Sequence, residues 1–174
     1  MVHQSDIAPE HIENDVEGET TETVVVDGRY TRRQVRSLTF HLLYAMEEHD
    51  YTVPLHELVE DYNHGFELDI PEDGEIVSTA QQVIQQRHQL DDLLIPYLEK
   101  WRLDRLGVCT RLILRLALWE FIHTDNVAMI IINEAIELSK GFAEKDAYRF
   151  VNGVLDKVMQ DREAVKERAK ACIQ

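Results

Sequence analysis

The chain has 174 residues, of which 44% are hydrophobic, and a formal net charge of −15 at pH 7. This size and composition fit one globular domain, or two small subdomains that share a core. The sequence shows neither an apolar run long enough to cross a bilayer nor a signal peptide, so we expect a cytoplasmic protein. A charge this negative would ordinarily argue against nucleic-acid binding.

The first 28 residues differ in character from the rest of the chain. Residues 1–28 contain eight acidic residues and no Lys or Arg, and they show no sustained apolar period. Such a composition cannot bury enough apolar surface to fold, so it predicts an acidic, disordered extension. The folded domain is therefore predicted to span residues 29–174, with an N-terminal subdomain at about 31–101 and a C-terminal subdomain at about 103–170.

The first helix is predicted to run from Thr31 to about Glu48. Thr31 and Gln34 match the capping box, in which each side chain satisfies a backbone N–H of the other residue. The apolar face of this helix repeats at helical spacing, and it consists of Val35, Leu38, Leu42 and Met46.

Four arginines crowd the start of this helix, namely Arg29, Arg32, Arg33 and Arg36. Cations near a helix N-terminus oppose the helix dipole. Their presence there suggests an anion that comes from outside the chain. The alternative is that the arginines pair with carboxylates of the chain itself, and for a lone cluster in an acidic protein this alternative is favoured.

Two further helices are predicted in the N-terminal half. A short helix follows Pro54 and ends near Gly65. After a loop, a long helix is predicted from about Glu72 to Trp101, which Pro96 should kink or end early because proline removes a backbone hydrogen bond.

The middle of the chain is predicted to form the centre of the fold. Leu103 to Leu106 should form a single turn, and a helix should follow from Val108 to about His123. This helix is apolar on nearly every face, which is typical of a helix surrounded by others. No stretch alternates with a period of two for long enough to require a strand, so the predicted class is all-α.

An antiparallel helical hairpin is predicted between Asn126 and Val158, with a break after Gly141. The pair Asn152 and Gly153 is a β-hairpin signal. The helical period nevertheless runs through these two residues, so we expect a helix in which Gly153 marks close packing.

The sequence contains no recognisable catalytic, metal-binding or cofactor motif. Its histidines include no HExxH pattern, and glycine-rich phosphate loops and a GxSxG nucleophile motif are absent. Cys109 and Cys172 lack a CxxC partner and are expected to be reduced thiols. We therefore expect no enzymatic activity, no metal and no cofactor.

Several segments resemble the NusB family of bacterial transcription antitermination factors. INEAIELSKGF, at 132–142, and RFVNGVLDKV, at 149–158, are similar to the hallmark region of the family. LILRLALWEF, at 112–121, resembles its central helix, and RRQVRSLTFHLLYAME, at 32–47, resembles its arginine-rich first helix. The resemblance implies an all-α fold of two three-helix subdomains packed as one compact helical domain.

The resemblance also implies a function and partners. It implies binding of single-stranded boxA-like RNA of rRNA leader transcripts, jointly with the small-subunit ribosomal protein NusE, within the RNA polymerase antitermination complex and without a membrane. By position, the RNA-binding residues would be Arg29, Arg32, Arg33, Arg36, Lys145, Asp146, Arg149 and Phe150. We expect these two groups to lie beside each other, and the helix that ends at Phe142 to be mainly structural. The protein-partner surface would include Tyr44, Thr110 and Arg111.

The chain departs from the family pattern at three positions. Thr110 stands where the family often has an acidic residue, which would remove an ion pair to the protein partner. Ala143 and Ala147 stand where Gly and Ser are usual, which would remove a helix cap. Asp146 could accept a hydrogen bond from a base edge, or it could simply favour the helix N-terminus.

Two other functions are compatible with the sequence. The chain could be the NusB-like RNA-binding domain of an rRNA cytosine methyltransferase, which requires a longer protein than 174 residues. It could also be a helical protein-interaction module that does not bind RNA, as the negative charge suggests. If RNA does bind, we hypothesise that the acidic residues 1–28 compete with it for the neighbouring arginines.

Overall fold

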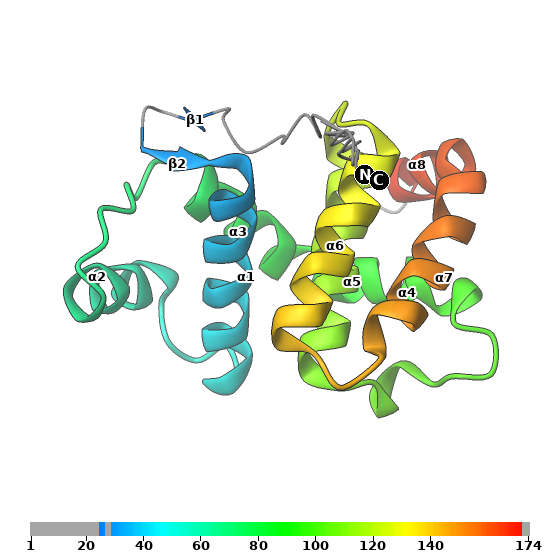
Figure 1. The fold of residues 1–174 in the computed structure, drawn as a ribbon, viewed down its shortest axis with the longest axis horizontal. Helices are drawn as coiled ribbons and strands as arrows, with labels where there is room; N and C mark the ends of the chain where they lie inside the picture. Colours follow the sequence, from blue (N-terminus) through cyan, green and yellow to red (C-terminus); the bar gives the residue numbers. More distant parts are fainter. Residues whose placement is uncertain (1–24, 27–28, 172–174) are drawn as a thin grey trace, which may run out of the picture.

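The computed structural model describes residues 25–26 and 29–171, and Figure 1 shows that helices dominate them. The predicted all-α class is therefore confirmed. The helices and strands are β1 (Val25–Val26), β2 (Tyr30–Thr31), α1 (Arg32–Glu48), α2 (Leu55–Gly65), α3 (Glu75–Gln85), α4 (Arg87–Leu94), η2 (Ile95–Tyr97), η3 (Leu103–Arg105), α5 (Val108–His123), α6 (Ala128–Phe142), α7 (Ala147–Gln160) and α8 (Arg162–Ala171).

Most of the predicted acidic extension lies outside the described residues. The two described residues within it, Val25 and Val26, form β1, which pairs antiparallel with β2. The expectation of disorder up to residue 28 is thus wrong for these two residues. Two residues on each side make a strand pair too short to change the fold class.

Helix α1 begins where the sequence predicted. The backbone N–H of Thr31 donates to Gln34 Oε1 at 2.8 Å, and the backbone N–H of Gln34 donates to Thr31 Oγ1 at 3.2 Å. Both halves of the predicted capping box are therefore present. The capping box therefore fixes where α1 begins, and with it the position of the first turn, which carries the arginines.

The predicted long helix ends early at Leu94, directly before the turn that contains Pro96, as expected, but it is also broken at a second point that was not predicted. The chain leaves helical geometry at Gln86, where φ is −94° and ψ is 5°, between α3 and α4. Gln86 Oε1 contacts His123 Nε2 at 2.8 Å, and the Arg87 guanidinium stacks 4.4 Å from the Tyr51 ring. Because these contacts join residues distant in sequence, the local helical pattern gave no sign of the break. Pro96 lies in η2.

Helix α5 occupies the centre of the fold, as predicted. All its residues from Leu112 to Phe121 are buried. It packs against α1, α4, α6, α7 and α8. Since α4 contacts α5 and α8 as well as α3, we propose that the two subdomains meet at Gln86 rather than near residue 102.

The predicted hairpin of helices is confirmed, and α6 and α7 pack against each other along their length (Figure 1). α6 continues one residue beyond Gly141, to Phe142. Asn152 and Gly153 lie inside α7, so the β-hairpin signal is correctly overruled. The expectation that Gly153 marks close packing is wrong, because a Cβ added there would meet no atom within 4 Å.

Two further findings concern the described part of the chain. None of its helices is long and apolar enough to cross a membrane. Among residues 25–26 and 29–171, no group of three or more His, Cys, Asp and Glu side chains is arranged to hold a metal ion.

Candidate nucleic-acid interface

Each arginine at the start of α1 forms an ion pair with a carboxylate of the chain. We call Arg29, Arg32, Arg33 and Arg36 the arginine cluster. The partners come from four different places in the fold, and the pairs are Arg29 with Asp69 at 3.3 Å, Arg32 with Glu75 at 2.9 Å, Arg33 with Glu134 at 3.2 Å and Arg36 with Glu120 at 2.9 Å. Pairing within the chain, the alternative that the sequence favoured, therefore occurs at all four positions.

Arg36 differs from the other three arginines because it is buried. Its residue is 9% exposed, and its guanidinium donates three hydrogen bonds to the Glu120 carboxylate at 2.9 to 3.1 Å. Burial lowers the pKa of Arg36, but the hydrogen bonds and charge of Glu120 outweigh burial and raise that pKa above its ordinary value. Arg36 thus fastens α1 to α5, a geometry that argues against the expected contact with RNA.

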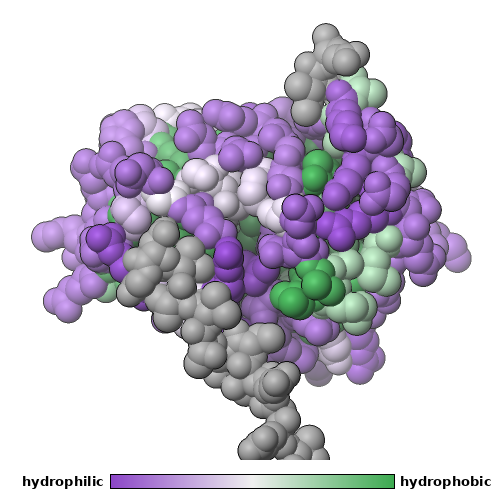
Figure 2. All heavy atoms as spheres, turned by 90° about the horizontal axis from the view of Figure 1, so that it is seen from above, coloured by the Kyte–Doolittle hydropathy of each residue, from purple (hydrophilic) through white to green (hydrophobic). Residues whose placement is uncertain are grey.

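The other three arginines remain accessible. The side chains of Arg29, Arg32 and Arg33 are 47%, 47% and 49% exposed. Figure 2 looks down on the end of the molecule where α1 and α6 begin, and hydrophilic residues dominate this face. A smaller hydrophobic area interrupts it, and the first turn of α6 has exposed large apolar side chains at Val127, Met129 and Ile130. An anion could reach the three arginines without unfolding the protein.

A second charged group lies where α6 passes into α7. We call Lys145, Asp146, Arg149 and Phe150 the junction patch. Lys145, Asp146 and Arg149 are exposed, whereas Phe150 is partly buried and meets the Trp101 ring edge-on, with the centroids 5.6 Å apart. Asp146 has a positive φ of 66° and makes no capping hydrogen bond with its side chain. Its carboxylate lies 3.9 Å from Arg149 Nε, in an ion pair whose side chains are both more than half exposed and therefore accessible to a ligand.

The arginine cluster and the junction patch do not lie beside each other, so that expectation is wrong. Glu134, the partner of Arg33, lies eight residues before the end of α6 at Phe142, a rise of about 12 Å along the helix, and Lys145 lies beyond that end. Figure 1 shows the starts of α1 and α6 at the top of the molecule, and the start of α7 at the bottom. The two groups mark the ends of a path along α6.

Phe142 is the last residue of α6, the helix that the sequence predicted to be mainly structural. It is 41% exposed. One face of its ring stacks on Phe40 at 5.1 Å, and His41 meets it edge-on at 4.9 Å. The lowered pKa of His41 follows from its burial. Helical spacing places Phe142 on the apolar face of α6, but it cannot show that α1 covers only part of the ring and leaves the rest exposed.

Only part of the predicted protein-partner surface is accessible. Tyr44 is 37% exposed, but Thr110 is only 3% exposed and donates to Glu144 Oε2 at 2.8 Å. The Arg111 side chain is 18% exposed and pairs with Glu47 at 2.6 Å. Thr110 therefore holds a carboxylate of the chain itself at the place where the family often has an acidic residue.

The Glu144 carboxylate also requires a glycine opposite it. Gly107 is the N-cap residue of α5, and a Cβ added there would lie 1.3 Å from Glu144 Oε1. Glu144 thereby places a negative charge at the N-terminus of α5, where the helix dipole favours it. This contact fixes the junction patch to the start of the central helix.

A network of charged side chains connects α1, α4 and α5 beneath the predicted partner surface. Arg115 pairs with Asp91 at 2.7 Å and with Glu47 at 3.2 Å. Tyr51 donates a hydrogen bond to the Glu47 carboxylate, and burial together with Glu47 raises the pKa of Tyr51 to about 12. Burial would raise the pKa of Glu47, but Tyr51, Arg111 and Arg115 lower it below its ordinary value of 4.5.

The stabilisation that Glu47 provides is expected to disappear in acid. Because its folded-state pKa lies below 4.5, the contribution is fully present above pH 4.5 and is lost as the pH falls through the folded-state value. Glu47→Gln should lower the free energy of unfolding by about 1 kcal/mol at pH 7. Urea titrations of both proteins between pH 7 and pH 3 should show this difference shrinking below pH 4.5. A difference that stays constant across this range would contradict the assignment.

Comparisons with known proteins agree with the fold. The NusB family model matches residues 33–160. The transcription antitermination protein NusB of Staphylococcus aureus is 33% identical over 129 residues, which cover 74% of this chain and 98% of that protein. The protein of the same name from Macrococcus caseolyticus is 40% identical over 80 residues, covering 46% of this chain and 62% of that protein. The structure of T. maritima NusB matches with a TM-score of 0.63 and 31% identity, over 76% of this chain and 93% of that one.

Proposed function

The chain belongs to the NusB family, and from this premise we propose that it is a non-enzymatic antitermination factor that binds single-stranded boxA-like RNA of rRNA leader transcripts. The observation that supports this proposal best is the path along α6. Accessible arginines lie at one end, the junction patch lies at the other, and Phe142, with its exposed ring, is the last residue of α6, three residues before the junction patch. Proteins bind single-stranded RNA by combining cations for phosphates with aromatic faces on which bases stack.

We propose different roles for the members of the two groups. Arg29, Arg32 and Arg33 would exchange their carboxylate partners for phosphates. In the junction patch, Lys145 and Arg149 would also meet phosphates, while Phe150 and the Asp146 carboxylate would meet a base. Arg36 is assigned a positioning role, because its guanidinium is buried and donates three hydrogen bonds to the Glu120 carboxylate.

We further propose that the ribosomal protein NusE docks at the end of α1 that carries Tyr44. Tyr44 is the exposed member of the expected partner surface, and the charge of Glu48 is the main cause that raises the pKa of its hydroxyl. An exposed tyrosine beside a carboxylate offers both apolar area and hydrogen bonds to a protein. Thr110 and Arg111 would act by holding Glu144 and Glu47 in place.

The proposal is tested by titrating a single-stranded boxA-like RNA at several salt concentrations, with and without the ribosomal protein. Affinity should fall as salt rises, because phosphate contacts release counterions. Arg33→Ala and Lys145→Ala should each weaken binding, and Lys145→Ala should reduce the slope of log affinity against log salt by about one. Lys170→Ala, at an exposed position on α8, is the matched control and should change nothing.

Two outcomes would contradict the proposal. If the protein binds no single-stranded RNA under any of these conditions, it is a helical protein-interaction module, a function favoured by the carboxylate on every arginine of the arginine cluster. If RNA binds but Arg33→Ala and Lys145→Ala bind as tightly as the control, RNA binding occurs on another surface.

A further inference from the structure

Trp101 is a large aromatic side chain that the core does not use. It lies between η2 and η3, and it is 59% exposed. Its ring meets Phe150 edge-on, at an interplanar angle of 61°. An edge-on neighbour leaves much of the indole face open to a ligand. The only other tryptophan of the chain, Trp119, is 7% exposed and belongs to the core.

Trp101 forms one wall of a groove of about 520 Å³. Six residues that define this tryptophan groove are Trp101, Arg105, Leu106, Lys145, Asp146 and Phe150. Three of them are members of the junction patch. The segment that precedes α5 passes beside the start of α7 in Figure 1, so the groove continues the proposed RNA surface away from α6.

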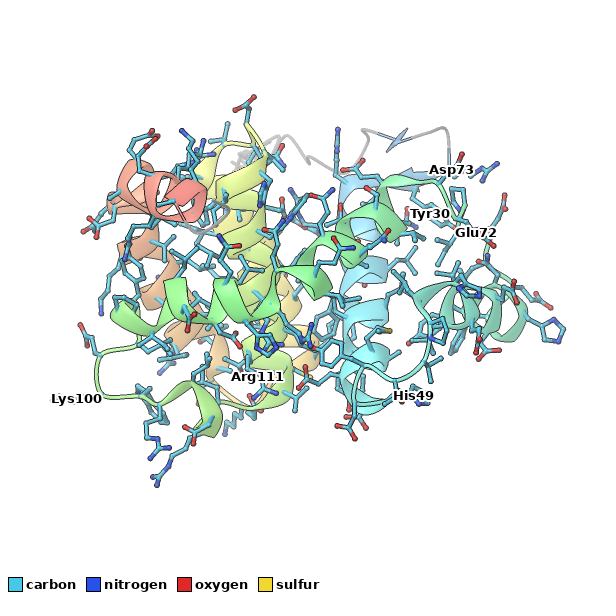
Figure 3. All side chains as sticks on the ribbon, turned by 180° about the vertical axis from the view of Figure 1, so that it is seen from behind. Tyr30, His49, Glu72, Asp73, Lys100 and Arg111 are labelled. Carbon is cyan, nitrogen blue, oxygen red and sulfur yellow. The ribbon has the colours of Figure 1, made fainter. Side chains whose placement is uncertain are left out.

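The segment that carries Trp101 is basic, although the chain as a whole is acidic. Residues 100–105 contain Lys100, Arg102 and Arg105 and a single acidic residue, Asp104. Arg102 binds Asp104 at 2.7 Å, so the cations outnumber the one carboxylate that is paired within the segment. In Figure 3, Lys100 marks this segment as a loop at the lower left edge of the molecule.

An exposed tryptophan could instead serve a protein partner, because tryptophan is enriched among residues that dominate protein interfaces. Two observations favour RNA. The groove shares Lys145, Asp146 and Phe150 with the junction patch, and Arg105 lines the same groove as the indole, with Lys100 next to Trp101 in sequence. Cations around an aromatic face are the combination with which proteins hold a stacked base and its phosphates.

We propose that the tryptophan groove receives one nucleobase of the bound RNA, stacked on the indole of Trp101, with the adjacent phosphates near Lys100 and Arg105. This inference rests on the proposed function and extends it, since Trp101 lies outside the arginine cluster and the junction patch. Stacking is tolerant of base identity because every base has a π-face. The groove therefore lengthens the bound segment rather than selecting a particular sequence.

The first test compares Trp101→Ala and Trp101→Phe with the wild-type protein in RNA titrations. Trp101→Ala should weaken binding by about ten- to a hundredfold, and Trp101→Phe should keep most of the affinity because phenylalanine also stacks. Phe66→Ala, which removes an aromatic that is 69% exposed at the end of α2, is the matched control and should bind as the wild type does. The urea unfolding midpoints of the three variants should match that of the wild type, because Trp101 and Phe66 are both exposed side chains outside the core.

A second measurement identifies the base. A series of RNAs, each with one abasic position, is titrated against wild type and Trp101→Ala. One abasic position should weaken binding to the wild type as much as the tryptophan substitution does, and the two losses should not add when combined. This cycle remains informative even if Trp101→Ala lowers the stability of the fold, because a general loss would add to every abasic position equally.

The outcomes separate this inference from the proposed function. If the wild type binds RNA, Lys145→Ala weakens binding and Trp101→Ala does not, the tryptophan groove is overturned and the proposed function stands. If the wild type binds no RNA with or without the ribosomal protein, both are overturned. If Trp101→Ala loses affinity for the ribosomal protein while RNA affinity is unchanged, the groove serves the protein partner and the inference is wrong.

Discussion

Replacing Glu120 with alanine is expected to lower the free energy of unfolding by about 3–5 kcal/mol, the usual cost of leaving a buried charge without its partner. The side chains of Glu120 and Arg36 are 8% and 10% exposed. Glu120→Ala would leave the Arg36 guanidinium in the interior with neither a counterion nor the three hydrogen bonds that it now donates. Urea titrations of the variant and the wild type at pH 7 measure the loss.

Two controls separate the buried charge from the interaction itself. Glu75→Ala removes the carboxylate of an accessible pair, Arg32 with Glu75, and should change the free energy of unfolding by less than about 1 kcal/mol. The double variant Arg36→Met/Glu120→Leu replaces both charges with apolar groups and should recover most of the stability. If Glu120→Ala costs no more than Glu75→Ala, Arg36 is not held in the way described, and it becomes a candidate RNA contact again.

Arg115→Ala is expected to be the second most destabilising change, with a loss of about 2–4 kcal/mol. The Arg115 side chain is 7% exposed, and removing it would separate α5 from Asp91 on α4 and Glu47 on α1. The loss should be smaller than for Glu120→Ala. Asp91 and Glu47 are 15% and 18% exposed, so water can solvate them in part, and Arg111 still pairs with Glu47.

Thermal or urea unfolding of Arg115→Ala should be compared with that of Arg102→Ala. Arg102 and Asp104 form an equally short pair of 2.7 Å, but their side chains are 69% and 62% exposed. Exposed pairs contribute between zero and about 1 kcal/mol, so Arg102→Ala should leave stability nearly unchanged. Similar losses in the two variants would show that burial does not determine the strength of these ion pairs.

Local patterns were sufficient to predict most of the helices. The capping box at Thr31 and Gln34, the apolar α5 and the helical period through Asn152 each depend on residues close together in sequence. The break at Gln86 does not. It accompanies contacts with His123 on α5 and with Tyr51, to which Arg87 stacks, and such tertiary contacts override local helix preference.

The candidate site was harder to predict than the fold, for an electrostatic reason. The positions of the arginines were evident from the sequence, but their partners were not, because the four carboxylates come from separate parts of the chain, namely Asp69, Glu75, Glu120 and Glu134. It could not distinguish buried Arg36 from its exposed neighbours. The exposure of Trp101 was equally hidden, since the predicted long helix placed this residue at its end.

The ion pairs of the arginine cluster have a consequence for the ions around the protein. An arginine that turns from its carboxylate to a phosphate leaves that carboxylate bare, and a bare carboxylate attracts a cation from solution. RNA binding at Arg29, Arg32 and Arg33 would thus release condensed cations from the RNA and take up cations at Asp69, Glu75 and Glu134. Cation release from the RNA and cation uptake by the carboxylates partly cancel, so the net number of ions released is smaller than the number of phosphates contacted.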